Sequence, residues 1–356
     1  MPAAGLSNKW NTDLNRKHRG QTRRDDLEEE IALARRCLET RVPRGVALLL
    51  REAPASVWLA SGLSKTAAEV GRQILTAERG RPTLCLSPRQ WLSQPLSPCV
   101  SVLVTYRGRN RDAQAVATCL ASVKQTPVIV LTGHRNNPAV DVLRRARCRL
   151  HVIAAPTHRP ESAFVAVRAV IALSALATRL ALSAVPPVRT EVLHHKLDDL
   201  VTKANDAAME LVPRITSLPD WQSRTWTVLT SGVPEPMRAA YQSLLGESGL
   251  ASTSWFDAAD FLHGNYHAVL NAPSRSLLLV LTDHTADRLG ALIARRLGPL
   301  IPVFHVSHPG IPEQSLWCHL LTAVFLTRML APAAHISLRH PPRPAAAQHW
   351  TRWDGQ

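Results

Sequence analysis

The segments VWLASG (residues 57–62) and WTVLTSG (residues 226–232) decide the fold. Each is a short apolar run that ends in Ser-Gly, and a stretch with helical spacing of apolar residues follows each of them. A buried strand, a tight turn and a helix form the unit from which parallel sheets are built. Because this unit occurs twice, the sequence predicts two similar α/β lobes, the second a degenerate copy of the first.

The rest of the chain continues this alternation of strands and helices. In the first half we expect strands at residues 56–60, 83–86, 100–105, 127–132 and 150–154, with helices at 65–78, 112–123, 137–147 and 160–182. In the second half we expect strands at 225–230, 252–256, 276–281 and 302–306, with helices at 235–246, 286–297 and 313–330. The pattern predicts an α/β protein with two tandem lobes, each a parallel sheet flanked by helices.

Five regions follow from this pattern. Residues 1–45 form an N-terminal extension with one helix, and residues 46–185 form the first lobe. A connecting helix region (186–220) opens with a Pro-Pro pair, and the second lobe covers residues 221–332. Residues 333–356 form an irregular tail rich in Arg, Pro and His.

Length and composition fit this organisation. The 356 residues suffice for about two domains, and 46% apolar with 19% charged residues is a globular composition. The polar, basic start lacks a secretory signal, and Arg168 and Arg179 interrupt the most apolar stretch, so we expect no membrane span and a cytoplasmic location. The six cysteines lack metal or disulfide spacing, which favours free thiols in a reducing compartment.

The positive net charge raises the question of whether the protein binds nucleic acid. Lys and Arg number 42 against 27 Asp and Glu, giving a formal net charge of +15. Aromatic residues make up only 5%, and no zinc-finger, basic-zipper or RNA-binding aromatic motif accompanies the arginines. These features disfavour nucleic-acid binding without excluding it, and a small anionic ligand explains a local arginine cluster equally well.

Three turns follow predicted strands of the first lobe: SGLSKT (61–66), TYRGRNRD (105–112) and TGHR (132–135). Turns at the carboxyl ends of parallel strands bring backbone amides and helix N-termini together, which suits a phosphate group. Helix capping alone explains each turn separately. The candidate phosphate- and sugar-binding residues are Ser61, Gly62, Ser64, Thr105, Arg107, Gly108, Arg109 and Asn110.

The order of these motifs resembles the tandem sugar isomerase (SIS) domain family of phosphosugar proteins, which includes the isomerase half of glucosamine-6-phosphate synthase. In that family the turn after the middle strand looks like S-x-S-G-x-T-x-D and grips the sugar phosphate. This chain keeps Gly108 and Asp112 there, while arginines replace hydroxyls. The resemblance covers residues 57–310 and implies two flavodoxin-like lobes, a sugar phosphate or amino-sugar phosphate ligand, a homodimer, and neither cofactor nor metal.

The second lobe carries further family features. The family places a glutamate late in the helix after the glycine turn and a His-Gly beyond it, and this chain has Glu247 and His263-Gly264 after Gly232. The resemblance therefore makes Glu247 and His263 the catalytic candidates. The doublets Asp283-His284 and His194-His195 are interpreted as surface or capping residues.

Departures from the family leave the activity open. The family's proton-transferring base corresponds to Ser254, and a hydroxyl is a poor base without an activating partner. Its C-terminal Schiff-base lysine has no evident match, and Asn265 replaces the proline after His-Gly. Two hypotheses remain: an isomerase or deaminase of a sugar phosphate, and a catalytically silent sensor or interaction protein.

Overall fold

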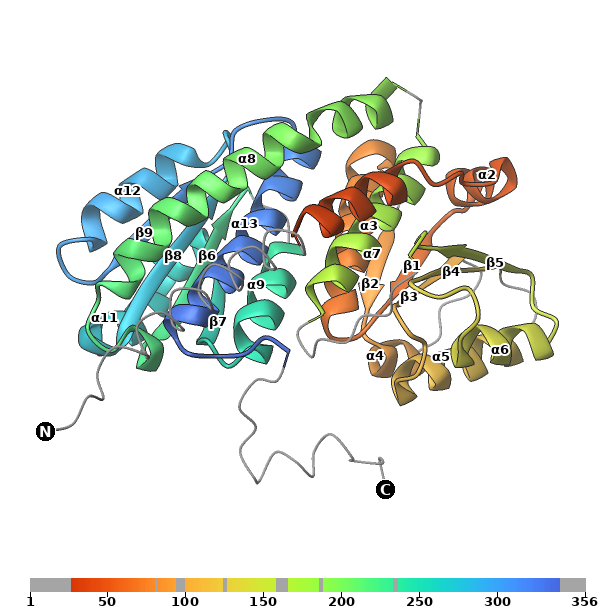
Figure 1. The fold of residues 1–356 in the computed structure, drawn as a ribbon, viewed down its shortest axis with the longest axis horizontal. Helices are drawn as coiled ribbons and strands as arrows, with labels where there is room; N and C mark the ends of the chain where they lie inside the picture. The colour runs from red at the N-terminus through yellow and green to blue at the C-terminus, as the bar shows by residue number, and fades with distance from the viewer. Residues whose placement is uncertain are drawn as a thin grey trace, which may run out of the picture.

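The computed structural model describes residues 27–80, 82–93, 100–123, 127–157, 166–185, 188–232 and 236–339, and it contains two parallel sheets (Figure 1). The first sheet has the strand order β2-β1-β3-β4-β5. Its strands are β1 (Ser56–Leu59), β2 (Thr83–Leu86), β3 (Val100–Thr105), β4 (Val128–Thr132) and β5 (Leu150–Ala154).

The second sheet has the order β7-β6-β8-β9, which matches the order of the first four strands of the first sheet. It comprises β6 (Thr225–Ser231), β7 (Ser252–Asp257), β8 (Ser276–Thr282) and β9 (Val303–Ser307). The α/β class with two parallel-sheet lobes is therefore confirmed, and each predicted strand agrees with an observed one to within a residue at either end.

Helices flank both sheets. The first lobe has α2 (Arg44–Glu52), α3 (Leu63–Arg79), α4 (Pro88–Ser93), α5 (Arg111–Ser122), α6 (Pro138–Arg145) and α7 (Val167–Ser183). The second part has α8 (Val188–Thr216), η1 (Trp221–Ser223), α9 (Pro236–Glu247), α10 (Ala258–Asp260), η2 (Phe261–Asn265), α11 (Tyr266–Leu270), η3 (Pro273–Arg275), α12 (Asp287–Leu297) and α13 (Pro312–Ala333).

Some of these helices differ from the sequence-based expectation. The pattern did not predict α2, α4 or the short helices between β7 and β8. The long helix expected from residue 160 is observed as α7, while residues 158–165 lie outside the described part. The expected connecting helix is α8, 29 residues long.

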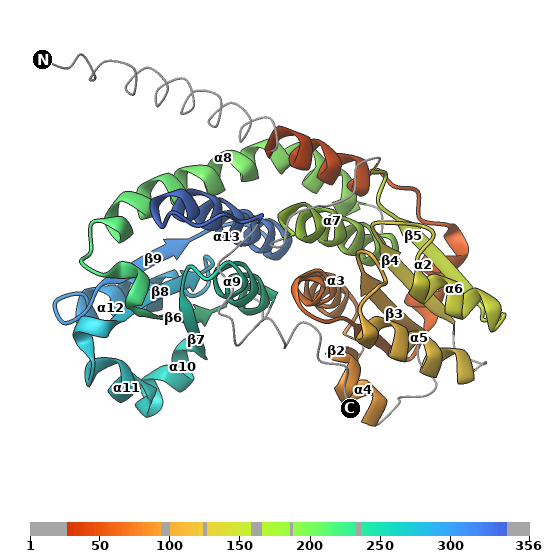
Figure 2. The ribbon, with the colours of Figure 1, turned by 60° about the horizontal axis from the view of Figure 1, so that its bottom comes forward.

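The helices between the two sheets share one apolar core. The largest core cluster joins α3 and α7 of the first lobe to α8, α9 and α13 of the second. Figure 2 shows α3, α7, α9 and α13 between the two sheets, with α8 passing over α13. Alternate residues along each strand point to opposite faces, so Trp58 enters this shared core while Val57 faces the outer core under α5 and α6. A separate cluster lies under η2, α11 and α12 on the outer face of the second sheet.

A helix over residues 27–38 lies across the junction of the lobes, where the sequence predicted one N-terminal helix. Its Glu29 pairs with Arg168 of α7 at 3.1 Å, and its Glu30 pairs with Arg328 of α13 at 2.6 Å. Arg35 pairs with Asp198 of α8. The extension therefore contacts elements of both lobes.

Helix α13 is long and apolar enough to cross a membrane by length and composition, but 78% of its apolar window is buried in the protein. Its side chains pack on α8 and α9 in the shared core. This burial explains the apolar character of α13 as that of a core helix.

Candidate functional site

The carboxyl ends of β1 and β3 lie where the strand order of the first sheet reverses. From β1 the chain proceeds to β2 on one side and then to β3 on the other. A crevice opens at such a reversal, and doubly wound sheets bind ligands there. The first two sequence-predicted turns follow these two strands, so both lie at this position.

A side-chain hydrogen bond joins the two turns. Asn110 donates from Nδ2 to Oγ of Ser61 at 3.0 Å, and its Oδ1 accepts from the backbone N–H of Ala113 at 2.7 Å. Asn110 is thus the N-cap of α5 and a bridge to the other turn. By contrast, no side chain caps α3 after Gly62, which leaves its N-terminal amides able to face an anion.

Glu247 of the second lobe reaches this crevice. Gly62 has a φ of +54°, and a methyl group built on it would come to 3.9 Å from Oε1 of Glu247. Glu247 ends α9, which packs against α3. The structure therefore brings Ser61, Gly62, Asn110 and Glu247 together from two lobes.

The protonation of Glu247 is shifted by its surroundings. Burial raises the pKa of this carboxyl, and a hydrogen bond with Ser243, one helical turn earlier, partly offsets the effect. A carboxyl whose pKa moves toward neutral is suited to both donating and accepting a proton. Glu247 is therefore the side chain of this crevice best suited to acid–base chemistry.

Thr105, Gly108 and Asn137 build the second turn. The Gly108 N–H donates to Oγ1 of Thr105 at 3.2 Å. Gly108 has a φ of +60°, and a Cβ there would lie 1.9 Å from Oδ1 of Asn137. Asn137 caps α6 and donates to Oγ1 of Thr132 at 3.1 Å. Thr105 and Gly108 consequently shape the turn from within.

Arg107 and Arg109 are exposed and supply the positive charge of this region. Both lower the pKa of His134 in the third turn, although partial burial is the larger cause. The His134 ring lies edge-on to Tyr106, with centroids 5.4 Å apart. The two guanidinium groups thus extend the positive charge from the β3 turn toward the β4 turn.

The corresponding position of the second sheet is different. Gly232 follows β6 with a φ of +72°, but a Cβ there would lie 2.4 Å from Oδ1 of Asp283, which follows β8. This carboxylate accepts from the N–H of Thr285 at 2.9 Å and from its hydroxyl at 2.6 Å. The turn after β6 therefore leaves less room beside its glycine than the turn after β1 does.

Other predicted residues lie in different places. Ser64 is half-buried in the first turn of α3, and the neighbouring Thr66 is fully buried. His263 is exposed in η2, which packs on the outer face of the second sheet. Figure 2 places α10 and α11, on either side of η2, at the end of the second lobe that is remote from α3. The structure does not bring His263 to Gly62 within one chain. His195 is exposed on α8, and nothing is described of the His194 side chain.

Ser254 shows what has replaced the family's base. It lies in β7 opposite Thr227 of β6, and the two hydroxyls share a hydrogen bond of 2.9 Å. A hydroxyl bound to another hydroxyl is not activated for proton abstraction.

Sequence reasoning missed Asn137 and Ser243. The predicted helix over 137–147 begins at Asn137, but the closeness of its side chain to Gly108 depends on a neighbouring turn and has no local sequence signal. Ser243 stands four residues before Glu247, the spacing that aligns side chains on one helix face. Within the described residues, no group of three or more His, Cys, Asp or Glu is arranged to hold a metal ion.

The chain has the fold of two tandem SIS lobes, and solved structures of low sequence identity share it. It is similar to glucosamine-6-phosphate deaminase from Thermotoga maritima, with a TM-score of 0.64 and 14% identity over 90% of this chain and 97% of the other. It is also similar to the C-terminal domain of glucosamine-fructose-6-phosphate aminotransferase from Francisella tularensis, with a TM-score of 0.61 and 12% identity over 88% and 96%. No family model matches the sequence, and no curated protein matches it closely.

Proposed function

We propose that this chain binds a phosphorylated sugar or amino sugar in the crevice between β1, β3 and the end of α9. The observation that carries the proposal is the approach of Glu247 to Gly62 at the strand-order reversal of the first sheet. Uncapped amides of α3 and the arginines at 107 and 109 suit a phosphate, while Ser61 and Asn110 suit sugar hydroxyls. The names of the two similar structures contain glucosamine-6-phosphate and glucosamine-fructose-6-phosphate, which supports a phosphorylated sugar or amino sugar as the ligand class.

The test is thermal stabilisation by a panel of sugar phosphates, amino-sugar phosphates and their unphosphorylated parents. A ligand at about a hundredfold its Kd stabilises the native state by roughly 2.7 kcal/mol. We expect stabilisation by phosphorylated compounds only. Absence of stabilisation by every compound would contradict the proposal.

The position of the phosphate is tested by Arg107→Ala/Arg109→Ala, with Arg295→Ala/Arg296→Ala on α12 as the matched control. All four arginines are exposed, so neither double variant disturbs the core. We expect the first pair to weaken ligand binding at least about tenfold and the control to leave it unchanged. Unchanged affinity in the first pair would contradict our placement of the phosphate.

One observation favours a silent sensor over an isomerase or deaminase. The hydrogen bond between Ser254 and Thr227 leaves no base at that position, so Glu247 is the remaining acid–base group of the crevice. Exchange of the bound sugar's protons with D₂O, measured by NMR, distinguishes the enzyme from the silent sensor. Exchange that Glu247→Gln abolishes indicates an enzyme, and absence of exchange indicates a sensor.

We further propose a cytoplasmic homodimer. Because His263 lies on the outer face of the second lobe, it can serve a crevice only in a second copy of the chain. Light scattering gives the oligomeric state. If the protein is a dimer and His263 acts across it, a mixture of His263→Ala and Glu247→Gln chains will regain activity that each variant lacks alone.

A further inference from the structure

Strand β5 forms one edge of the first sheet, remote from the proposed sugar phosphate crevice. It pairs in parallel with β4, and no other described strand pairs with it. An edge strand presents backbone N–H and C=O groups outward, which is a template for a further strand. Figure 1 shows β5 at the outer margin of the first lobe.

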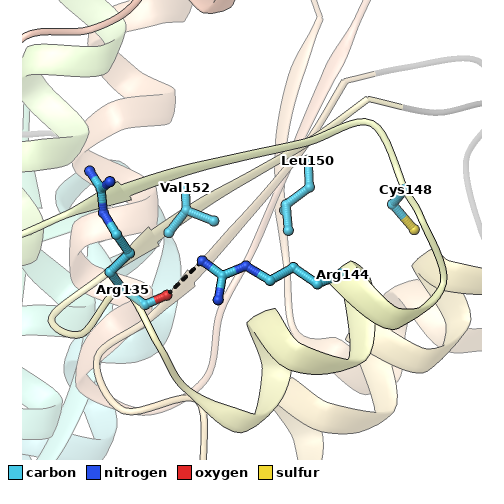
Figure 3. A pocket seen from close by; sticks show the side chains of 5 residues that line it. All are labelled: Arg135, Arg144, Cys148, Leu150 and Val152. Atoms are coloured by element: carbon cyan, nitrogen blue, oxygen red, sulfur yellow. Dashed lines mark hydrogen bonds between the residues drawn. The ribbon is translucent and has the colours of Figure 1, made fainter.

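A hollow of about 420 Å³ lies beside this edge, between β5 and α6. Figure 3 shows Leu150 and Val152 pointing from β5 toward the side chain of Arg144. That guanidinium donates to the carbonyl of Arg135 at 3.4 Å and to Oδ1 of Asn136 at 3.0 Å, which fixes it along the hollow. The hollow therefore has apolar side chains on one wall and a positioned positive charge on another.

The surroundings of the edge are mostly basic. Between residues 127 and 157 the sequence has one acidic residue, Asp141, which pairs with Arg144 at 3.7 Å. Arginines stand at both ends of the strand and on the helix beside it, and all are exposed: Arg135, Arg144, Arg145, Arg147 and Arg149.

We propose that the β5 edge binds an extended acidic peptide segment of a partner protein, which adds as a strand beside β5 and places apolar side chains in the hollow. Main-chain hydrogen bonds supply affinity in this mode, and pockets for alternate side chains supply specificity. The positive charge of the exposed arginines favours an acidic peptide as the bound segment. A second copy of this chain would bring like-charged arginines face to face, whereas glutamates or aspartates flanking an apolar residue complement them. An edge of unpaired backbone N–H and C=O groups favours a peptide strand over a nucleic acid.

The test is fluorescence anisotropy with a labelled peptide of alternating Val and Glu. The comparison probes are its Val–Lys counterpart, unstructured poly-Glu of equal charge and a single-stranded oligonucleotide. We expect saturable binding of the Val–Glu peptide and slower amide exchange at residues 150–154 when it is bound. No binding up to about 1 mM, or equal binding of poly-Glu or the oligonucleotide, would overturn the proposal.

Charge-reversal variants locate the site. Arg147→Glu/Arg149→Glu is expected to weaken peptide binding at least about tenfold, because attractive contacts become repulsive; both side chains are exposed at the start of β5. The matched control Arg295→Glu/Arg296→Glu changes the net charge equally on the other lobe and is expected to leave binding unchanged. Equal loss in both variants would mean that net charge alone attracts the peptide and would overturn the assignment. Stabilisation by sugar phosphates should persist in both, which separates this test from that of the crevice.

Discussion

Glu247 shows how position rather than residue type sets the behaviour of a side chain. It is one of 27 acidic residues, but α9 carries it to within reach of Gly62, where burial raises its pKa. The native carboxyl therefore holds its proton to a higher pH than the unfolded one, whose pKa is near 4.5. The contribution of the Glu247 carboxyl to the free energy of unfolding is therefore fully present below the unfolded pKa and is lost as the pH rises through the higher native pKa.

We predict that Glu247→Gln removes this loss. The variant should gain stability relative to the wild type between pH 4 and pH 7, because an amide has no ionisation to resist. Urea unfolding at both pH values measures the difference, with the exposed Glu52→Gln as control. If the difference in free energy of unfolding between the variant and the wild type does not grow toward neutral pH, the prediction is wrong.

In the second lobe, His308 and His319 have lowered pKa values, whereas that of Glu247 is raised. Their ring centroids are 4.5 Å apart. The His308 ring forms a hydrogen bond with the hydroxyl of Thr322, and the His319 ring forms one with the backbone carbonyl of Thr282. Burial, with Lys203 beside His308, lowers the pKa of His308 to about 4, and burial together with its histidine neighbours lowers that of His319 to about 3. Since an unfolded histidine binds a proton near pH 6.5, unfolding takes up protons in this window.

We predict that stability falls as the pH drops from about 6.5 toward about 4, and that His308→Gln flattens this dependence. A glutamine amide can still donate to Thr322, so packing and the hydrogen bond persist. The midpoint of urea unfolding against pH is the measurement, and exposed His267→Gln is the control. An identical slope in His308→Gln and the wild type would show that other groups cause the acid sensitivity.

At the scale of elements, helix α3 connects the fold to the crevice. Its N-terminus faces the crevice, and its middle lies so close to β1 that a Cβ at Gly71 would be 2.3 Å from the Trp58 ring. Glycine at this position permits the close approach of helix and sheet.

We predict that Gly71→Ala destabilises the protein by about 1–3 kcal/mol through overpacking, although alanine favours the helix by about 1 kcal/mol. Gly45→Ala in α2 is the control, since nothing lies within 4 Å of its Cβ, and it should stabilise by up to about 1 kcal/mol. Chemical denaturation compares the two. Equal effects would mean that α3 can move away from Trp58 at little cost.

Strand and helix positions were the most predictable feature at this scale. Continuous apolar runs in β1 and β6 and helical periodicity in α3 and α9 are local properties, and all four elements agree with the pattern. The short helices α10, η2 and α11 were missed because segments of three to five residues carry no period. In the crevice, the Gly and Asn turns were found from their chemistry, whereas Asn137 was missed because its role depends on a neighbouring turn.

At the scale of the whole molecule, one apolar core serves both lobes. Helices from both halves fill it, and the N-terminal helix pairs with α7, α8 and α13 across it. Lobes that share a core cannot expose it separately without a large apolar penalty, so we expect them to unfold together.

We predict that Glu30→Ala lowers the stability of both lobes by about 1–3 kcal/mol, because it leaves Arg328 without its 2.6 Å partner beside the core. Glu29→Ala is the control, since the Glu29 side chain is 45% exposed and its pair with Arg168 should contribute at most about 1 kcal/mol. Calorimetry should give a single transition in every variant. Two separated transitions would contradict a common core.

The class of fold, the strand-turn-helix units and the chemistry of the turns could be predicted from the sequence, because these depend on local periodicity and on residues within a few positions of each other. The three-dimensional structure was needed to show that Glu247 meets Gly62, that Asp283 occupies the corresponding position of the second sheet, and that His263 lies on the outer face. These are contacts between segments far apart in the chain. They follow from how two sheets pack on one shared layer of helices, and no local pattern encodes that arrangement.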